Sequence, residues 1–66
     1  MSVEDISHQL KTPLTSITIM LDNLKDNPSM EESTKQKFIF EISKQIDWIS
    51  SLVVALLKIA KFDATN

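Results

Sequence analysis

Cysteine, glycine and tyrosine are all absent from this chain of 66 residues, and histidine occurs once. Without cysteine, a disulfide framework and thiolate metal sites are excluded. A single histidine among scattered carboxylates makes a zinc site a poor interpretation, and we expect no metal. Without glycine, tight turns, β-hairpins and loops that cradle phosphate groups are disfavoured. Long helices are therefore the natural form for this chain.

The chain also lacks a strong charge and a long apolar run. The formal net charge is −2 and no basic cluster occurs, so we expect no nucleic-acid partner. The longest apolar run, Leu52 to Leu57, is too short to cross a bilayer, and no signal peptide is visible. We therefore expect a soluble segment. A domain this small buries little apolar surface, and oligomerisation is the remaining way to stabilise it.

The apolar residues predict an all-α fold with two helices in one domain, residues 1–66. The first helix should span about 2–25, opened by a capping box of Ser2 and Asp5. Pro28 ends it, which leaves a connector at about 26–29. The second helix should span about 30–62, opened by a capping box of Ser29 and Glu32.

Each predicted helix carries one apolar stripe at helical spacing. The stripe of the first helix comprises Ile6, Leu10, Leu14, Ile17, Leu21 and Leu24. The wider stripe of the second comprises Phe38, Ile42, Ile46, Ile49, Val53, Leu56 and Ala60, flanked by Ile39, Leu52, Leu57 and Ile59. Trp48 lies beside this second stripe and is predicted to be at the edge of the core.

A short connector predicts an antiparallel helical hairpin, which is too small to cover the wide second stripe by itself. The simplest cover is a second copy, which gives a homodimeric four-helix bundle. The alternative is that the excess apolar surface packs against another domain.

The run from Ser7 to Leu14 contains the residues that suggest chemistry. His8 is predicted on the helix face opposite the stripe, with Thr12 one turn later on the same side. An imidazole nitrogen is a nucleophile used in covalent group transfer. Pro13 clashes with the carbonyl of Gln9 and removes the N–H that would bond it, so a kink is predicted near Pro13. The structural alternative is a solvated surface histidine beside a tolerated proline.

These residues resemble a known motif. Ile6-Ser7-His8-Gln9-Leu10-Lys11-Thr12-Pro13-Leu14 is similar to the phosphoacceptor motif of two-component sensor histidine kinases, Ser-His-Glu-Leu-(Arg/Lys)-Thr-Pro-Leu. Seven of these eight positions match. The end of the second helix, residues 56–64, looks like the family's exit toward its ATP-binding domain. The whole chain thus resembles the dimerisation and histidine-phosphotransfer domain.

The resemblance implies roles for individual residues. His8 would accept the γ-phosphoryl group of ATP and pass it to an aspartate of a response regulator. Thr12 would orient a water molecule in a phosphatase reaction on that regulator, since phosphoryl transfer depends mainly on positioning. Lys11 would contact a phosphate group or an acidic partner, or be a solvated lysine. Gln9 stands where the family usually has glutamate, and glutamine cannot act as a carboxylate base.

Two further residues on the face of His8 are predicted to contact the regulator, Thr15 and Ile19. On a helical wheel, Ile19 falls on the outer face, where a polar residue is expected. An exposed apolar side chain there suits a docking point for a helix of the regulator. The alternatives for Ile19 are an incidental exposed residue or a contact with the opposing subunit.

The leading prediction is therefore the phosphoacceptor and dimerisation domain of a protein-histidine kinase. No glycine-rich nucleotide site is present, so ATP and magnesium would be held by a separate catalytic domain, without which the domain is inactive. The domain would be a cytoplasmic segment of a membrane-anchored bacterial receptor. One alternative is a structural dimerisation bundle of a degenerate kinase. Another is a stand-alone phosphorelay carrier, against which the Thr-Pro motif argues.

Overall fold

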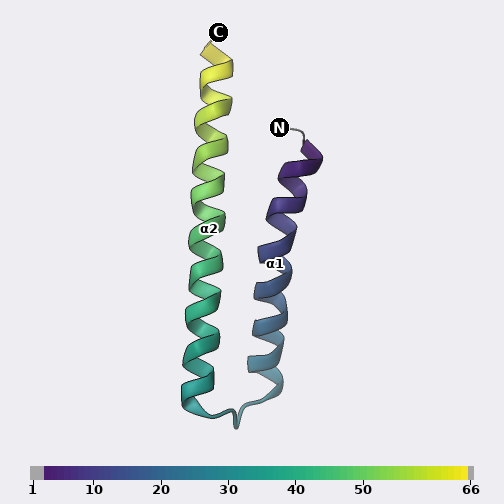
Figure 1. The fold of residues 1–66 in the computed structure, drawn as a ribbon, viewed down its shortest axis with the longest axis vertical. Coiled ribbons are helices and arrows are strands. Elements are labelled where there is room, and N and C mark those ends of the chain that lie inside the picture. The colour runs from purple at the N-terminus through teal and green to yellow at the C-terminus, as the bar shows by residue number, and fades with distance from the viewer. Residues whose placement is uncertain (1–2, 66) are drawn as a thin grey trace.

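The computed structural model describes residues 3–65, and the side chains of residues 4–61. It consists of two helices, α1 (Val3–Asp26) and α2 (Glu32–Thr65). They run antiparallel and form a hairpin of 55 × 18 × 13 Å, with both ends of the chain at the end away from the connection (Figure 1). The described residues contain no strand. The predicted all-α hairpin is confirmed.

Helix α1 ends at Asp26 because Pro28 disfavours the helical conformation of the residue before it. The Asn27 side-chain amide caps the end by donating a 2.9 Å hydrogen bond to the carbonyl oxygen of Asn23. Glu4 and Asp5 in the first turn and Lys25 in the last have the signs that complement the helix dipole. The predicted capping box of Ser2 lies partly outside the described residues.

The start of α2 differs from the prediction by about half a turn. Residues 27–31 form the connection, with a 3.0 Å hydrogen bond from Met30 N–H to the Asn27 carbonyl oxygen. The first helical bond runs from Lys35 N–H to the Glu31 carbonyl oxygen, so Glu31 occupies the N-cap position. The predicted capping box of Ser29 and Glu32 is therefore wrong, because the turn at Asn27 holds Ser29 outside the helix.

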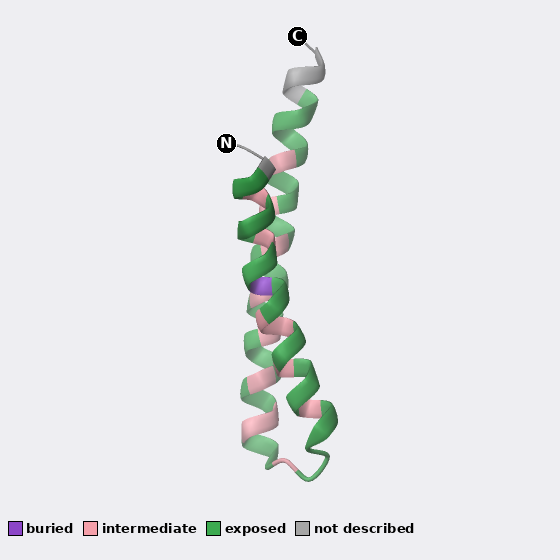
Figure 2. Ribbon diagram, turned by 90° about the vertical axis from the view of Figure 1, so that its right-hand side faces the viewer, coloured by how far each residue is buried: buried purple, intermediate pink, exposed green. Residues whose placement is uncertain are grey.

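The line along which the two helices pack, here called the seam, is rotated from the predicted stripes. On α1 it contains one buried residue, Pro13, and five half-buried ones: Ile6, Leu10, Ile17, Met20 and Leu24. On α2 it contains the half-buried Phe38, Ile42, Gln45, Ile49, Leu52 and Leu56. Figure 2 shows the partly buried positions in pink along both helices and the single buried one about halfway up. The seam follows alternating steps of three and four residues, as in coiled-coil packing.

Five residues that the stripes placed in the core are exposed instead, one of them Ala60 of α2. Leu14 and Leu21 of α1 have exposed fractions of 51% and 45%, and Ile46 and Val53 of α2 have 49% and 40%. Trp48, predicted at the core edge, is 53% exposed. The seam and the stripes coincide at their other positions up to Leu56. At Leu14, Leu21, Ile46 and Val53 the seam contains the preceding residue instead.

The exposed apolar residues that follow a seam position by one residue form a set of six, here called the apolar face: Leu14, Leu21, Ile39, Ile46, Val53 and Leu57. Each α-helix turns right-handed along its own direction. In an antiparallel pair, the positions just after the seam on both helices therefore lie on the same side of the hairpin. Positions just before the seam lie on the opposite side.

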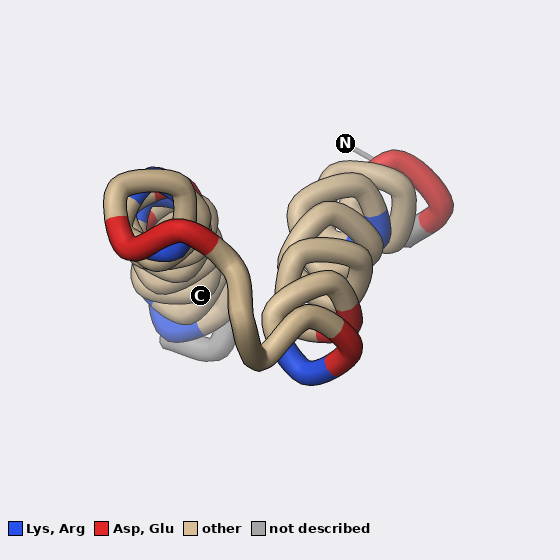
Figure 3. Tube along the Cα trace, turned by 90° about the horizontal axis from the view of Figure 1, so that it is seen from below, with Lys and Arg blue, Asp and Glu red and all other residues tan. Residues whose placement is uncertain are grey.

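Facing levels follow from the helix ends beside the connection, because α1 ends at Asp26 where α2 begins at Glu32 and both helices rise equally per residue (Figure 1). Counting outward from these two ends places Met20 level with Phe38, Pro13 level with Gln45, and Leu10 within one residue of the level of Ile49. The apolar face therefore holds Leu21 near Ile39 and Leu14 near Ile46, one pair on each level. Seen from the connection, acidic residues lie at the adjoining ends of both helices, and basic residues occur singly along them (Figure 3).

Candidate functional site

His8 lies in the second turn of α1 and its side chain is exposed, as are those of its neighbours Gln9, Lys11 and Thr12. The apolar residues at positions 6 and 10 turn toward α2, and this fixes the orientation of the helix. His8 consequently faces solvent on the side of α1 away from the seam. A rigid helix thus presents the imidazole to any protein that approaches.

Thr12 is fixed directly below His8. Its hydroxyl donates a hydrogen bond of 3.2 Å to the backbone carbonyl oxygen of His8, four residues earlier. The hydroxyl proton is used in this bond, while the lone pairs of the oxygen remain available as acceptors. An acceptor thus lies one turn from the imidazole on the same face.

Pro13 is the only buried residue among positions 4–61. It occupies a seam position, so its ring packs against α2 at the level of Gln45. Helix α1 continues through it from Val3 to Asp26. Because proline has no N–H, the carbonyl oxygen of Gln9 lacks its usual helical donor. The kink predicted near Pro13 remains a prediction.

The two residues predicted to contact a regulator, Thr15 and Ile19, are both exposed, and Ile19 is 56% exposed. Thr12 and Ile19 each precede a seam position by one residue, so they lie on the side of the hairpin opposite the apolar face. Trp48 precedes the seam residue Ile49 and lies on this same side. The sequence analysis placed Trp48 at the core edge because it adjoins the stripe residue Ile49, whereas its side chain is a surface residue in the structure.

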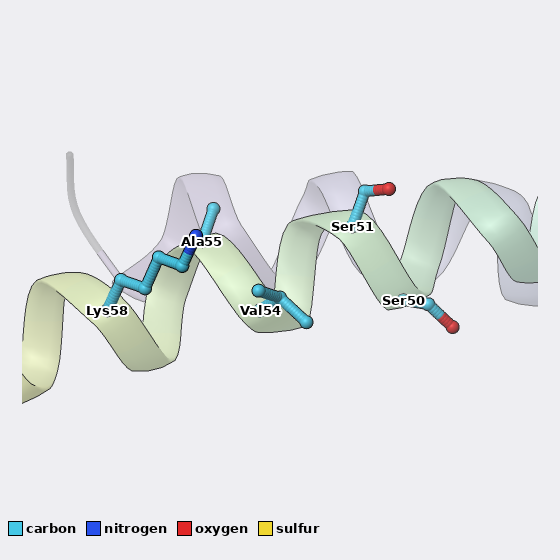
Figure 4. Close-up of a pocket in the computed structure, with 5 residues that line it drawn as sticks. All are labelled: Ser50, Ser51, Val54, Ala55 and Lys58. Atoms are coloured by element: carbon cyan, nitrogen blue, oxygen red, sulfur yellow. The ribbon is translucent and has the colours of Figure 1, made fainter.

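The described residues hold no group of three histidine or carboxylate side chains that could bind a metal ion. A shallow hollow lies on the outer side of α2, lined by Ser50, Ser51, Val54, Ala55 and Lys58 (Figure 4). All five side chains come from one helix and are exposed, and none belongs to the His8 face. The hollow and the run around His8 therefore lie on separate parts of the surface.

This run lies on an exposed helical face of a two-helix hairpin, and the chain matches the His Kinase A (phospho-acceptor) domain over residues 2–65. The chain belongs to this family. A phosphoacceptor role follows for the domain, and the match to sensor histidine kinases made from the sequence is confirmed.

Three relatives illustrate the family. The chain is 34% identical over 61 residues to the heme sensor protein HssS of Staphylococcus haemolyticus, which covers 92% of this chain and 13% of that protein. It is 37% identical over 60 residues to the sensor histidine protein kinase HK06 of Streptococcus pneumoniae, covering 91% and 13%. It is 32% identical over 60 residues to the sensor histidine kinase MtrB of Mycobacterium leprae, covering 91% and 11%.

The chain thus spans only about an eighth of the length of these relatives. No solved structure gives a significant match. Within residues 3–65, neither helix has an apolar stretch long enough to cross a membrane.

Proposed function

We propose that His8 is the phosphoacceptor of this domain. It is the only histidine of the chain, it stands at the histidine of the family motif, and its side chain is exposed. An unprotonated imidazole nitrogen supplies the electron pair for a new N–P bond while the bond between the γ-phosphorus and the bridging oxygen of ATP breaks, and ADP leaves. ATP and magnesium are held by a separate catalytic domain.

The phosphoryl group then passes from His8 to an aspartate carboxylate of a response regulator. In this step the N–P bond breaks, an O–P bond forms, and the imidazole is regenerated. Thr12 lies one turn away and acts in the opposing phosphatase reaction. It orients water for hydrolysis of the regulator's phospho-aspartate. Lys11 contacts a phosphate group or an acidic partner, and Thr15 and Ile19 contact the regulator.

The test uses the kinase that contains this domain, with ATP labelled on the γ-phosphate. Wild type should acquire label that is lost in acid and stable in base. His8→Ala should acquire none, whereas the neighbouring Ser7→Ala should label normally. Label that persists in His8→Ala within this domain would contradict the proposal.

We also infer that the domain is a homodimer through its apolar face. The hairpin exposes 5300 Å², whereas a compact monomer of 7.5 kDa is expected to expose about 4,200 Å². The excess of roughly 1,100 Å² per chain exceeds the ~800 Å² that one partner buries in an interface of ordinary size. Six exposed apolar residues on one side of the hairpin supply that surface. Two copies packed by this face make a four-helix bundle with two-fold symmetry.

Two variants that introduce the same charge test whether the dimer forms through the apolar face or through another surface. Ile46→Glu places a carboxylate in the centre of the apolar face, and light scattering should report monomers. Phe40 is more exposed in the hairpin, 62% against 49% for Ile46, but lies off that face. Phe40→Glu should therefore remain dimeric. Dissociation by Phe40→Glu but not by Ile46→Glu would assign the dimer to another surface.

The domain is expected to operate as a cytoplasmic segment of a membrane-anchored bacterial receptor, since the relatives it matches are sensor proteins several times its length. Alone it is expected to be inactive, because the nucleotide site is proposed to belong to a separate catalytic domain.

A further inference from the structure

Trp48 stands out once the apolar face is assigned to the dimer. It is the only tryptophan of the chain, and 53% of it is exposed. It precedes the seam residue Ile49 by one position, so it lies on the side of the hairpin that carries Thr12 and Ile19. Dimerisation through the apolar face leaves it uncovered.

Trp48 also lies at the level of the reactive turn. Counting outward from the adjoining helix ends at Asp26 and Glu32 puts the Trp48 backbone level with residues 10 and 11. Helical side chains lean toward the N-terminus of their own helix. For α2 this direction runs toward the connection (Figure 1). The indole therefore leans to the level of Thr12.

A protein that binds over His8 with an interface of ordinary size would also contact Trp48. One partner buries about 800 Å², which corresponds to a disc of roughly 16 Å radius. Packed helices have axes about 8–10 Å apart, so Trp48 lies within such a disc centred on His8. Tryptophan is among the residues most enriched at sites that dominate binding energy.

We propose that Trp48 is the anchor on α2 for the receiver domain of the response regulator, and that it determines how tightly this regulator binds. This inference rests on the proposed function. The receiver is favoured over the ATP-binding domain because the large exposed apolar side chains on this side of the hairpin, Ile19 and Trp48, lie from the level of Thr12 toward the connection. Ile19 and Trp48 thus form one surface with Thr12, and the proposed role of Thr12 is in hydrolysis of the regulator's phospho-aspartate.

The experiment measures two reactions of the kinase that contains this domain. The first is labelling of His8 from ATP. The second is transfer of the label to the receiver domain that accepts it fastest among a panel of purified receiver domains. Trp48→Ala should label His8 within about twofold of wild type. Its KM for the receiver should rise about tenfold or more with little change in the maximal transfer rate.

Two variants complete the comparison. Trp48→Phe keeps a large aromatic side chain and should recover most of the affinity for the receiver. Val54→Ala removes apolar surface from the outer side of α2, where 49% of Val54 is exposed, and should transfer normally. Normal transfer by Trp48→Ala would overturn the inference, as would an equal loss in both reactions, which would assign Trp48 to the ATP-binding domain or to the fold. Absence of label on wild-type His8 would instead contradict the proposed function itself.

Discussion

The Thr12 hydroxyl lies 3.2 Å from the backbone carbonyl oxygen of His8 and donates a hydrogen bond to it. This bond couples the rotamer of Thr12 to the turn that carries the proposed phosphoacceptor. It also leaves the Thr12 oxygen as an acceptor, so in the proposed phosphatase reaction this hydroxyl would orient water by accepting a hydrogen bond from it.

Replacement of Thr12 should separate the two reactions of the domain. Thr12→Val keeps the branched shape and removes the hydroxyl, and it should lower phosphatase activity toward the regulator by about tenfold or more, since a mispositioned water reacts slowly. Labelling of His8 should stay within about twofold. Thr12→Ser restores the hydroxyl and should retain most of the phosphatase activity. Equal phosphatase rates in Thr12→Val and wild type would show that another group orients the water.

Gln9 should limit the rate of histidine phosphorylation. Gln9→Glu supplies a carboxylate beside His8 that can accept the imidazole proton, and the initial rate of labelling from ATP should increase. Ser7→Glu adds the same charge on the other side of His8 in sequence and on a different helix face, and it serves as the control for charge alone. An unchanged or lower rate in Gln9→Glu would show that the glutamine already suffices.

Pro13 should lower the free energy of unfolding of the hairpin and allow α1 to bend. Pro13→Ala restores the N–H that bonds the Gln9 carbonyl oxygen, which favours the helix by about 3 kcal/mol, while the lost packing of the buried ring offsets part of this. We expect a net stabilisation of about 1–2 kcal/mol in urea unfolding. The predicted bend should be lost, with slower labelling of His8. A less stable Pro13→Ala would show that packing against α2 outweighs the missing hydrogen bond.

Glu32 should make the start of α2 sensitive to acid. A hydrogen bond from the Gln36 side chain, 3.0 Å long, and then the charge of Lys35 lower the pKa of Glu32 below its ordinary value of 4.5. A lowered pKa in the folded state means that the stabilisation is complete above the ordinary value and is lost as the pH falls through the lowered one. Thermal melts of Glu32→Gln and wild type should therefore differ more at pH 7 than at about pH 3. A difference that is the same at both pH values would contradict this.

The number and approximate bounds of the helices can be predicted from the sequence, because its helix-breaking residues and its apolar spacing indicate the same two helices. Pro28 stops the first helix, no glycine interrupts either helix, and both carry apolar residues at helical spacing. The predicted stripes differ from the seam by one residue at four positions, because a helical wheel finds the average apolar direction of a helix. In this chain that direction lies between the contact within the hairpin and the exposed apolar face. Pro13 thus replaces Leu14 in the seam, and Gln45 replaces Ile46.

The candidate site was predictable as a helix face but not in its details. The spacing of His8 and Thr12 is enough to place them on one side of α1. The bond of Thr12 to the His8 carbonyl depends on a side-chain rotamer, which spacing does not determine. The start of α2 depends on the turn between Asn27 and Met30, a bond between backbone atoms that residue types alone did not disclose.

The most direct measurement of the central claim locates the phosphoryl group itself. The kinase is incubated with ATP, kept at alkaline pH, and fragmented in a mass spectrometer so that positions 7, 8, 12 and 15 are resolved. We predict a phosphoryl group on His8 alone. A phosphoryl group on Ser7, Thr12 or Thr15 with His8 unmodified would contradict the account.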